Sequence, residues 1–234
     1  MTRALELIEL AHGLLRDLPD CRLWGVDDGA LVLGEDATQF VFCWHGALTV
    51  RQSGAWPHVL TAGMWAAVPG KCEIRPVGTE LSRGLVISRA GWLGMMQIGG
   101  PLEERGRLRY IDGCTDSLLV PPVRLGDPCL NGLWFPMGTV QTMHSHPSVR
   151  VGMVVRGRGW CETPAGREEL QAGMVFVIHP GGEHRFLTGA ESGLTVVAWH
   201  PDSDTGPTDV DHPMVRRTMV GGVSAAVLEG IQTR

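Results

Sequence analysis

GTVQTMHSHPSVRVGMVVRG (residues 138–157) and GMVFVIHPGGEHRF (residues 173–186) are the stretches that decide the fold of this 234-residue chain. In the first, His144 and His146 are two residues apart in an apolar context. Side chains at positions i and i+2 of a strand point to the same face, so both imidazoles are expected to aim at one point. His184 follows a Pro-Gly-Gly turn, and a strand pairing across a small barrel would bring it there too. Three neutral imidazoles on rigid strands predict a site for one divalent transition metal, with Fe(II) or Zn(II) favoured over Mn, Ni or Cu.

The first stretch resembles one of the two sequence motifs of the cupin superfamily. That motif is glycine, five residues, His-x-His, three or four residues, glutamate, six residues and glycine. Here Gly138 and Gly157 provide the glycines, the histidines fall at the expected places, and Arg150 stands where the motif has glutamate. Every spacing fits, so the resemblance implies a jelly-roll-like β-barrel that carries the metal site.

The second stretch resembles the other cupin motif, which is glycine, five residues, Pro-x-Gly, two residues and histidine. Gly173, Pro180, Gly182 and His184 match its residue types. The proline comes one place late and the last gap is one residue short. The resemblance is strong over about residues 125–200 and extends more weakly to about residues 25–90.

Arg150 in place of the glutamate changes the chemistry that the motif implies. Arginine stays protonated and cannot ligate a metal, which leaves three protein ligands and open coordination positions. A buried guanidinium needs an anionic partner. A substrate carboxylate can provide it through a bidentate contact, as in the thiol dioxygenases of the cupin superfamily, which this arrangement resembles. The alternative is a protein acid such as Glu162 or Glu183.

Outside these stretches, the chain from Leu23 onward breaks into short apolar runs separated by Gly, Pro, Asp and Ser, which is typical of an all-β barrel or sandwich. An internal repeat supports two copies of one domain. LTAGMWAAVPGKCEI (residues 60–74) corresponds to LQAGMVFVIHPGGEHRF (residues 170–186), and Gly46 to Gly157, at offsets of 110 to 111 residues. The fold class predicted is therefore all-β, with two tandem cupin domains and a short N-terminal helix.

The boundaries and contents of the two copies follow from the repeat. A helix is expected at residues 1–20, because Leu5, Ile8, Leu15 and Leu18 lie near one stripe. A step of 111 residues back from the three histidines reaches Leu33, Glu35 and Glu73, so the first domain is expected to be a metal-free scaffold, dimer surface or lid. The predicted domains are residues 21–110, degenerate and without metal ligands, and residues 111–234, metal-binding with a C-terminal tail.

Two further features near the predicted barrel mouth admit two interpretations each. His179 precedes Pro180 at the end of a strand, and is either an acid/base or supporting group of the site or an exposed turn residue. The acidic, proline-rich segment after Trp199 either folds over the mouth or is a plain terminal connection.

Composition excludes some classes of function. The formal net charge of −5 leaves no basic footprint for nucleic acid, and no long apolar run predicts a membrane span. The N-terminal sequence lacks the pattern of a signal peptide, and six dispersed cysteines without a CxxC pair indicate free thiols, so a cytoplasmic location is expected. Family precedent and two sheet-rich domains favour a homodimer.

Three functions remain compatible with the sequence. The first is a metal-dependent enzyme acting on a small, carboxylate-bearing molecule, in its best form a non-heme Fe(II) dioxygenase with Arg150 as the anchor of the substrate. The second is a Zn- or Mn-dependent isomerase, lyase or rearrangement enzyme at the same site. The third is a non-enzymatic small-molecule sensor, because a fold alone does not select a function.

Overall fold

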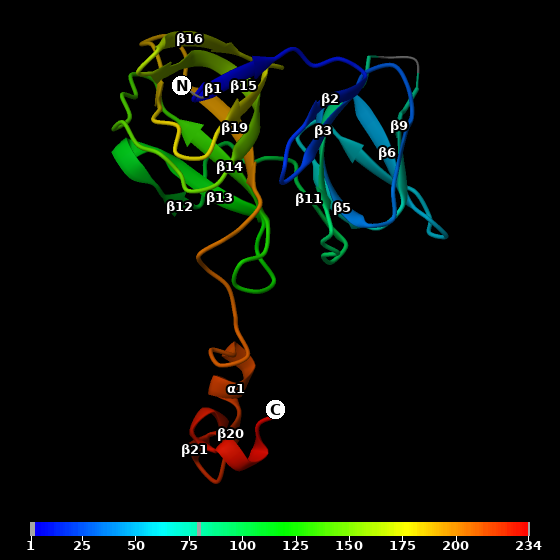
Figure 1. Ribbon diagram of the computed structural model, residues 1–234, viewed down its shortest axis with the longest axis vertical. Coiled ribbons are helices and arrows are strands. Elements are labelled where there is room, and N and C mark those ends of the chain that lie inside the picture. The colour runs from blue at the N-terminus through cyan, green and yellow to red at the C-terminus, as the bar shows by residue number, and fades with distance from the viewer. Residues whose placement is uncertain (1–2, 79–80, 234) are drawn as a thin grey trace.

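The computed structural model describes residues 3–78 and 81–233, and its body consists of two groups of β-strands that lie side by side (Figure 1). Within the described residues, the first group forms a six-stranded and a four-stranded sheet, which enclose a core that includes Leu48, Leu60 and Ile74. The six-stranded sheet has the order β11 (Gln97–Gly99), β8 (Trp65–Pro69), β5 (Ala37–His45), β10 (Arg83–Ala90), β3 (Arg22–Val26) and β2 (Gly13–Asp17). The four-stranded sheet has the order β4 (Leu31–Leu33), β9 (Cys72–Pro76), β6 (Ala47–Gln52) and β7 (His58–Thr61).

The second group forms, within the described residues, one nine-stranded sheet that curls around a core including Leu170, Phe176 and Phe186. The long strand β15 belongs to both walls, because its first half pairs with β17 and β19 and its second half pairs with β16 and β18. The order is β1 (Leu5–Ile8), β17 (Val175–Ile178), β15 (Arg150–Thr163), β19 (Leu194–His200), β14 (Cys129–Phe135), β13 (Thr115–Val120) and β12 (Leu108–Arg109), with β16 (Gly166–Gln171) and β18 (Arg185–Leu187) paired to β15.

The all-β prediction is confirmed, and the two groups share a pattern of strands. The order β8, β5, β10, β3 in the first corresponds to β17, β15, β19, β14 in the second. The Ala-Gly-Met turns of the repeat also match. Gly63 (φ +85°) donates its backbone N–H to Cys43, and Gly173 (φ +93°) donates to Val154, each over 2.8 Å. Both turns need the left-handed backbone conformation that glycine adopts without strain.

The predicted N-terminal helix is wrong. Residues 5–8 form β1, which pairs with the edge of β17, and residues 13–17 form β2, which pairs with β3. Leu5 is buried in the second core, and Gly13 has φ +98°, outside the helical region. The open edges of two sheets offer backbone hydrogen bonds and apolar contacts, and this tertiary context outweighs a weak helical pattern.

The two groups pack against each other through a continuous apolar core. It joins Phe40 of the first group to Met153 and Trp199 of the second, and the rings of Phe40 and Trp199 lie 5.8 Å apart. Indole N–H groups add polar links across the contact, because Trp44 donates to the carbonyl of Val155 over 2.9 Å. The first group therefore supports the inner strands of the second sheet.

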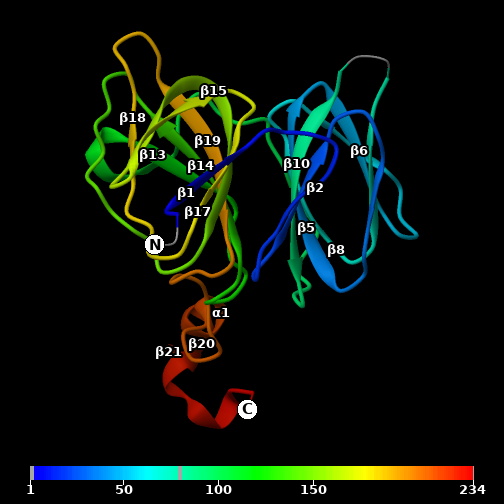
Figure 2. The ribbon, with the colours of Figure 1, turned by 45° about the horizontal axis from the view of Figure 1, so that its top comes forward.

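The C-terminal segment leads away from both groups (Figures 1 and 2). Residues 203–209 first contact the loop at residues 124–126, and Asp209 pairs with Arg124 over 2.7 Å. Beyond this point the segment extends from the body. Among the described residues, no helix is long and apolar enough to cross a membrane. Its elements are α1 (Pro213–Arg217), β20 (Met219–Val220), β21 (Val223–Ser224) and the 3-10 turns η2 (Ala225–Val227) and η3 (Glu229–Ile231); a further 3-10 turn, η1 (Ile111–Gly113), precedes β13.

Candidate metal centre

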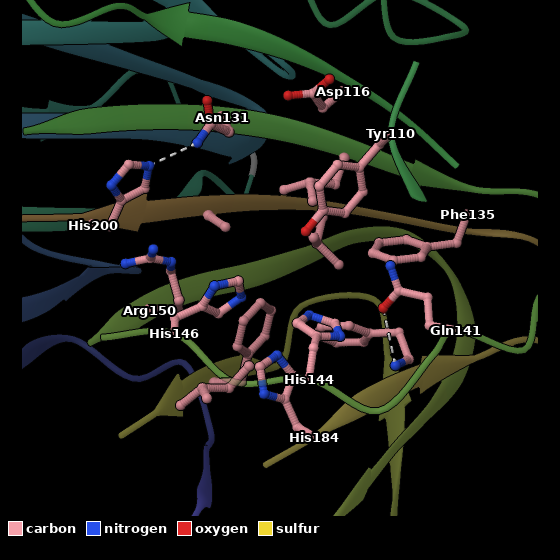
Figure 3. A pocket seen from close by; sticks show the side chains of 16 residues that line it. Tyr110, Asp116, Asn131, Phe135, Gln141, His144, His146, Arg150, His184 and His200 are labelled. Carbon is pink, nitrogen blue, oxygen red and sulfur yellow. Dashed lines mark hydrogen bonds between the residues drawn. The ribbon is translucent and has the colours of Figure 1, made fainter. Parts of the chain in front are cut away.

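A cavity of about 170 Å³ opens inside the second group of strands (Figure 3). Apolar side chains, among them Phe135, Phe176 and Ile178, form much of its wall. The polar groups that face it are Tyr110, Asp116, Asn131, Gln141, His144, His146, Arg150, His184 and His200. A small apolar cavity with a few convergent polar groups is the usual form of a small-molecule site.

The three predicted histidines meet in this cavity. One ligand nitrogen from each of His144, His146 and His184 can be chosen so that all lie within 4.8 Å of one another. His144 and His184 are joined by a β-bridge, with backbone N–H···O distances of 3.0 and 2.8 Å. His146 lies in irregular chain rather than in a strand, and its carbonyl accepts the N–H of Gly181 over 2.8 Å. Pairing between the two motif segments therefore sets the positions of the imidazoles.

Backbone carbonyls orient two of the three rings. Nδ1 of His144 lies 2.8 Å from the carbonyl of Thr142, and Nδ1 of His184 lies 2.9 Å from that of Gly182. A carbonyl can only accept, so each Nδ1 carries the proton and each Nε2 keeps its lone pair. This is the outer support that histidine ligands of metals usually have.

Burial keeps two of these imidazoles neutral. Desolvation, together with the charge of Arg150 and the neighbouring histidines, lowers the pKa of His146 to about 3. Desolvation likewise lowers the pKa of His184 to about 4. Neutral imidazole is the form that ligates a metal, so protons do not compete for these nitrogens near neutral pH. The donor set fits a divalent transition metal.

Arg150, the first residue of β15, faces the same cavity with a side chain that is 18% exposed. Its Nη1 donates to Ser148 Oγ over 2.6 Å and lies 3.9 Å from Asp202 Oδ1. The acid beside it is therefore Asp202, whereas Glu162 is paired with Arg167 and Arg185 on the outer part of β15. Burial lowers the pKa of Arg150, but a guanidinium stays charged at neutral pH.

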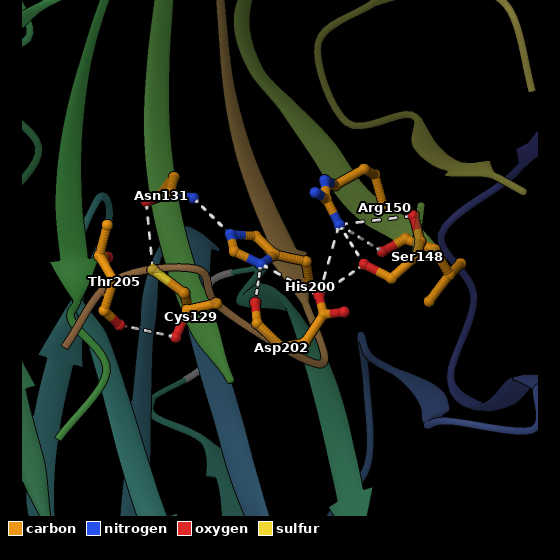
Figure 4. Close-up of polar contacts among 9 residues, drawn as sticks. Cys129, Asn131, Ser148, Arg150, His200, Asp202 and Thr205 are labelled. Atoms are coloured by element: carbon orange, nitrogen blue, oxygen red, sulfur yellow. Dashed lines mark hydrogen bonds and ion pairs between the residues drawn. The ribbon is translucent and has the colours of Figure 1, made fainter. Parts of the chain in front are cut away.

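A polar chain links the arginine to the neighbouring strands β19 and β14 of the same sheet (Figure 4). Ser148 Oγ donates to Asp202 over 2.5 Å, and the carbonyl of Asp202 accepts from Nδ1 of His200. Nε2 of His200 then accepts the amide N–H of Asn131 over 3.0 Å. Desolvation lowers the pKa of His200, in agreement with this neutral form. The chain fixes one wall of the cavity.

Comparison with known proteins gives a consistent result for the fold. The model of the AraC-like ligand binding domain matches residues 136–204, which include all three histidines. A cupin 2 conserved barrel domain protein from Leptotrichia buccalis superposes with a TM-score of 0.60 at 12% identity, covering 86% of this chain and 91% of that one. This chain has a cupin-type fold.

Two other solved structures are similar over most of the chain. The putative glyoxylate induced protein from Pseudomonas aeruginosa gives a TM-score of 0.65 at 15% identity, over 88% of this chain and 92% of that one. A salicylate 1,2-dioxygenase from Pseudaminobacter salicylatoxidans gives 0.62 at 12% identity, over 78% and 71%. No curated protein matches the sequence. Likeness at these identities shows the fold alone, and this fold is found in enzymes and in proteins of other kinds.

His179 does not lie with the other predicted residues of the cupin site. Its side chain is not part of the cavity wall, and its Nε2 lies 3.9 Å from Glu6 of β1. The two residues are joined because β1 adds to the edge of β17, a pairing that the predicted helix excluded. The structure brings Arg150 to the three histidines and leaves His179 outside.

The cavity also contains side chains that the motifs did not indicate. Tyr110 comes from the irregular segment before η1, Asp116 from β13 and His200 from the end of β19. Burial raises the pKa of Asp116, whose carboxyl faces the cavity. The alternation of polar and apolar residues along β13 and β19 was the available sequence signal for these side chains. Without the order of the strands in the sheet, it could not show which face of each strand lines the cavity.

The corresponding positions of the first group carry no comparable cluster. Leu33 is buried in the core, and Glu73 on β9 is bound by Arg51 and Arg75. Within residues 3–78 and 81–233, the three-histidine group is the one set of three or more His, Cys, Asp or Glu side chains close enough to share an ion.

Proposed function

We propose that this chain is a metal-dependent cupin enzyme acting on a small molecule that bears a carboxylate. The observation that carries the proposal is the convergence of three imidazoles on a cavity whose wall holds a half-buried, charged guanidinium. Bound divalent iron would supply the redox chemistry of a dioxygenase, which is the form we favour. His144, His146 and His184 would be its ligands.

The contacts of Arg150 suit a role in holding an anion. Its hydrogen bonds to described residues all use Nη1, which leaves Nε and Nη2 for a two-point contact with a carboxylate. Asp202 is 53% exposed and 3.9 Å away, so it balances the charge only in part. An anion in the cavity would complete the neutralisation of a charge that is costly to bury.

The same residues could also support Lewis-acid chemistry. The cavity would hold the substrate against Arg150 and the apolar wall, and zinc or manganese would then support isomerisation, elimination or rearrangement without oxygen. The identity of the metal separates this alternative from the dioxygenase.

A second candidate is a non-enzymatic binding module. The observation in its favour is the match of residues 136–204 to the AraC-like ligand binding domain. In this case the cavity would hold a small anionic ligand without turnover, and ligand affinity would be independent of oxygen.

We also propose that the chain consists of two cupin domains, with boundaries near residues 21–110 and 111–234. The matching strand orders and Ala-Gly-Met turns support this division. Three short strands cross these boundaries, because β1 and β12 pair in the second sheet and β2 pairs in the first. The first domain would serve as a scaffold through the shared core.

Elemental analysis of the protein purified without added metal tests the proposal. We expect near-stoichiometric metal in the wild type, trace metal in a His144→Ala/His146→Ala variant, and wild-type content in His58→Ala, which alters an exposed histidine of β7. Iron would favour the dioxygenase and zinc or manganese the Lewis-acid enzyme. Equal trace metal in all three proteins would contradict the metal site and favour the binding module.

A further inference from the structure

Tyr110 is the single tyrosine of the chain, and neither cupin motif gives its phenol a role. It lines the cavity, and Figure 3 shows its hydroxyl directed from the wall opposite Arg150 towards His144 and His146. The hydroxyl makes no hydrogen bond to any residue that the structure describes, and the residue is half-buried. The hydroxyl is therefore free to bond to a molecule that enters the cavity.

The segment that carries Tyr110 is fastened to the segment that carries His144. Asp112, two residues further on, accepts the backbone N–H of Thr142 over 2.7 Å and its hydroxyl over 3.2 Å. The carbonyl of the same Thr142 orients the imidazole of His144. A single residue thus connects the tyrosine segment with a candidate ligand of the metal.

The backbone at Asp112 supports a positioning role. Its φ of +52° lies in the left-handed region, which is uncommon for a residue other than glycine although asparagine and aspartate tolerate it best. The turn is closed by the N–H of Tyr110 bonding to Cys114 over 2.9 Å. Such a conformation persists where surrounding contacts impose it, and here those contacts lead to His144.

We propose that Tyr110 is a catalytic residue that donates a hydrogen bond to the anion bound beside the three histidines, and that Asp112 positions it. The inference rests on the proposed function and adds a second contact with the substrate. Arg150 would hold the carboxylate from one wall of the cavity. The neutral phenol of Tyr110, on the other wall, would donate to the atom of the anion that lies nearest the metal. A phenol can perform this role because it donates without adding charge.

The surroundings keep the phenol protonated. Burial, followed by the charge of Asp116, raises the pKa of Tyr110, and the more distant Arg150 opposes this only in part. The hydroxyl therefore remains a donor at neutral pH. An anion at the metal would accept the hydrogen bond that this hydroxyl can donate.

Azide binding to the Co(II)-loaded protein tests the donor role, with Co(II) absorption as the readout. Azide is a small anion that can enter an open coordination position. We expect Tyr110→Phe to bind Co(II) with unchanged affinity and unchanged melting temperature, but to bind azide about tenfold more weakly, as for loss of a hydrogen bond to a charged group. Equal azide affinity in the two proteins would overturn the inference and leave the metal site intact. Failure of the wild type to bind Co(II) would overturn the proposed function and the inference together.

Fluorine NMR gives a readout that does not depend on turnover. With one tyrosine, 3-fluorotyrosine labelling yields one protein resonance. We expect Co(II) to shift or broaden it strongly, and azide to move it in the Zn(II)-loaded protein. A resonance that responds to neither would place the phenol away from the metal and refute the inference.

Asp112→Gly tests the positioning role, because glycine keeps the left-handed backbone and removes the two carboxylate contacts. We expect it to weaken azide binding in the same direction as Tyr110→Phe and to reduce the effect of Co(II) on the fluorine resonance. Wild-type azide affinity together with a wild-type Co(II) effect would refute a positioning role for Asp112.

Discussion

The two groups of strands use one architecture with different contents. They share a strand order and a pair of hydrogen-bonded glycine turns, yet the second encloses a cavity with three histidines whereas the first buries leucines and isoleucine at its centre. At the first group's corresponding positions, Leu33 packs in the core and Glu73 is paired with two arginines. The difference teaches that the shared strand pattern supplies rigidity, and that a few side chains decide whether a barrel can hold a ligand.

The largest expected effect tests whether both groups contribute to one stable body. Leu60 and Leu170 occupy equivalent places in the repeat, and both are fully buried. We expect Leu60→Ala and Leu170→Ala each to lower the free energy of unfolding by about 2–5 kcal/mol, measured by urea denaturation. Because the groups share a core, each variant should still unfold in one transition. Two separate transitions in either variant would show that the groups fold independently.

A second prediction concerns anion binding, which should belong to the second group alone. We expect Arg150→Gln to weaken the binding of acetate to the metal-loaded protein at least about tenfold, measured by calorimetry, because the charged fork is lost. Arg150→Lys should recover only part of the affinity, since an ammonium cannot make the two-point contact. Arg167→Gln is the matched control, because Arg167 is 52% exposed and pairs with Glu162. Unchanged affinity in Arg150→Gln would remove this residue from the site.

The smallest expected effect is a dependence of apoprotein stability on pH. His146 and His184 have pKa values of about 3 and about 4 when folded, below the usual histidine value of about 6.5. At a pH between the folded and the unfolded pKa values, the unfolded chain binds more protons than the folded protein. The free energy of unfolding therefore falls as the pH drops from about 6.5 towards 4. The melting temperature of metal-free protein should show this fall, and His146→Gln/His184→Gln should show a shallower one. Parallel curves for the two proteins would contradict the burial of the neutral imidazoles.

The sequence could predict those features of the fold and the site that depend on the spacing of residues close together in the chain. The positions of His144, His146 and His184 follow from motif spacing and a turn, and alternating apolar runs indicated an all-β chain. The apolar stripe of residues 3–17 fits a helix as well as two edge strands, and only the open edges of β17 and β3 decide between them. Tyr110 reaches the cavity, and Asp202 reaches Ser148 beside Arg150, through irregular segments, so their places depend on tertiary contacts that no local pattern encodes.

X-ray absorption spectroscopy of the metal-loaded protein tests the central claim most directly. We expect about three imidazole nitrogens at about 2.0–2.1 Å from the metal if it is zinc, and loss of that signal in His144→Ala/His146→Ala. Thiolate scattering at about 2.3 Å, or a first shell without imidazole, would contradict it.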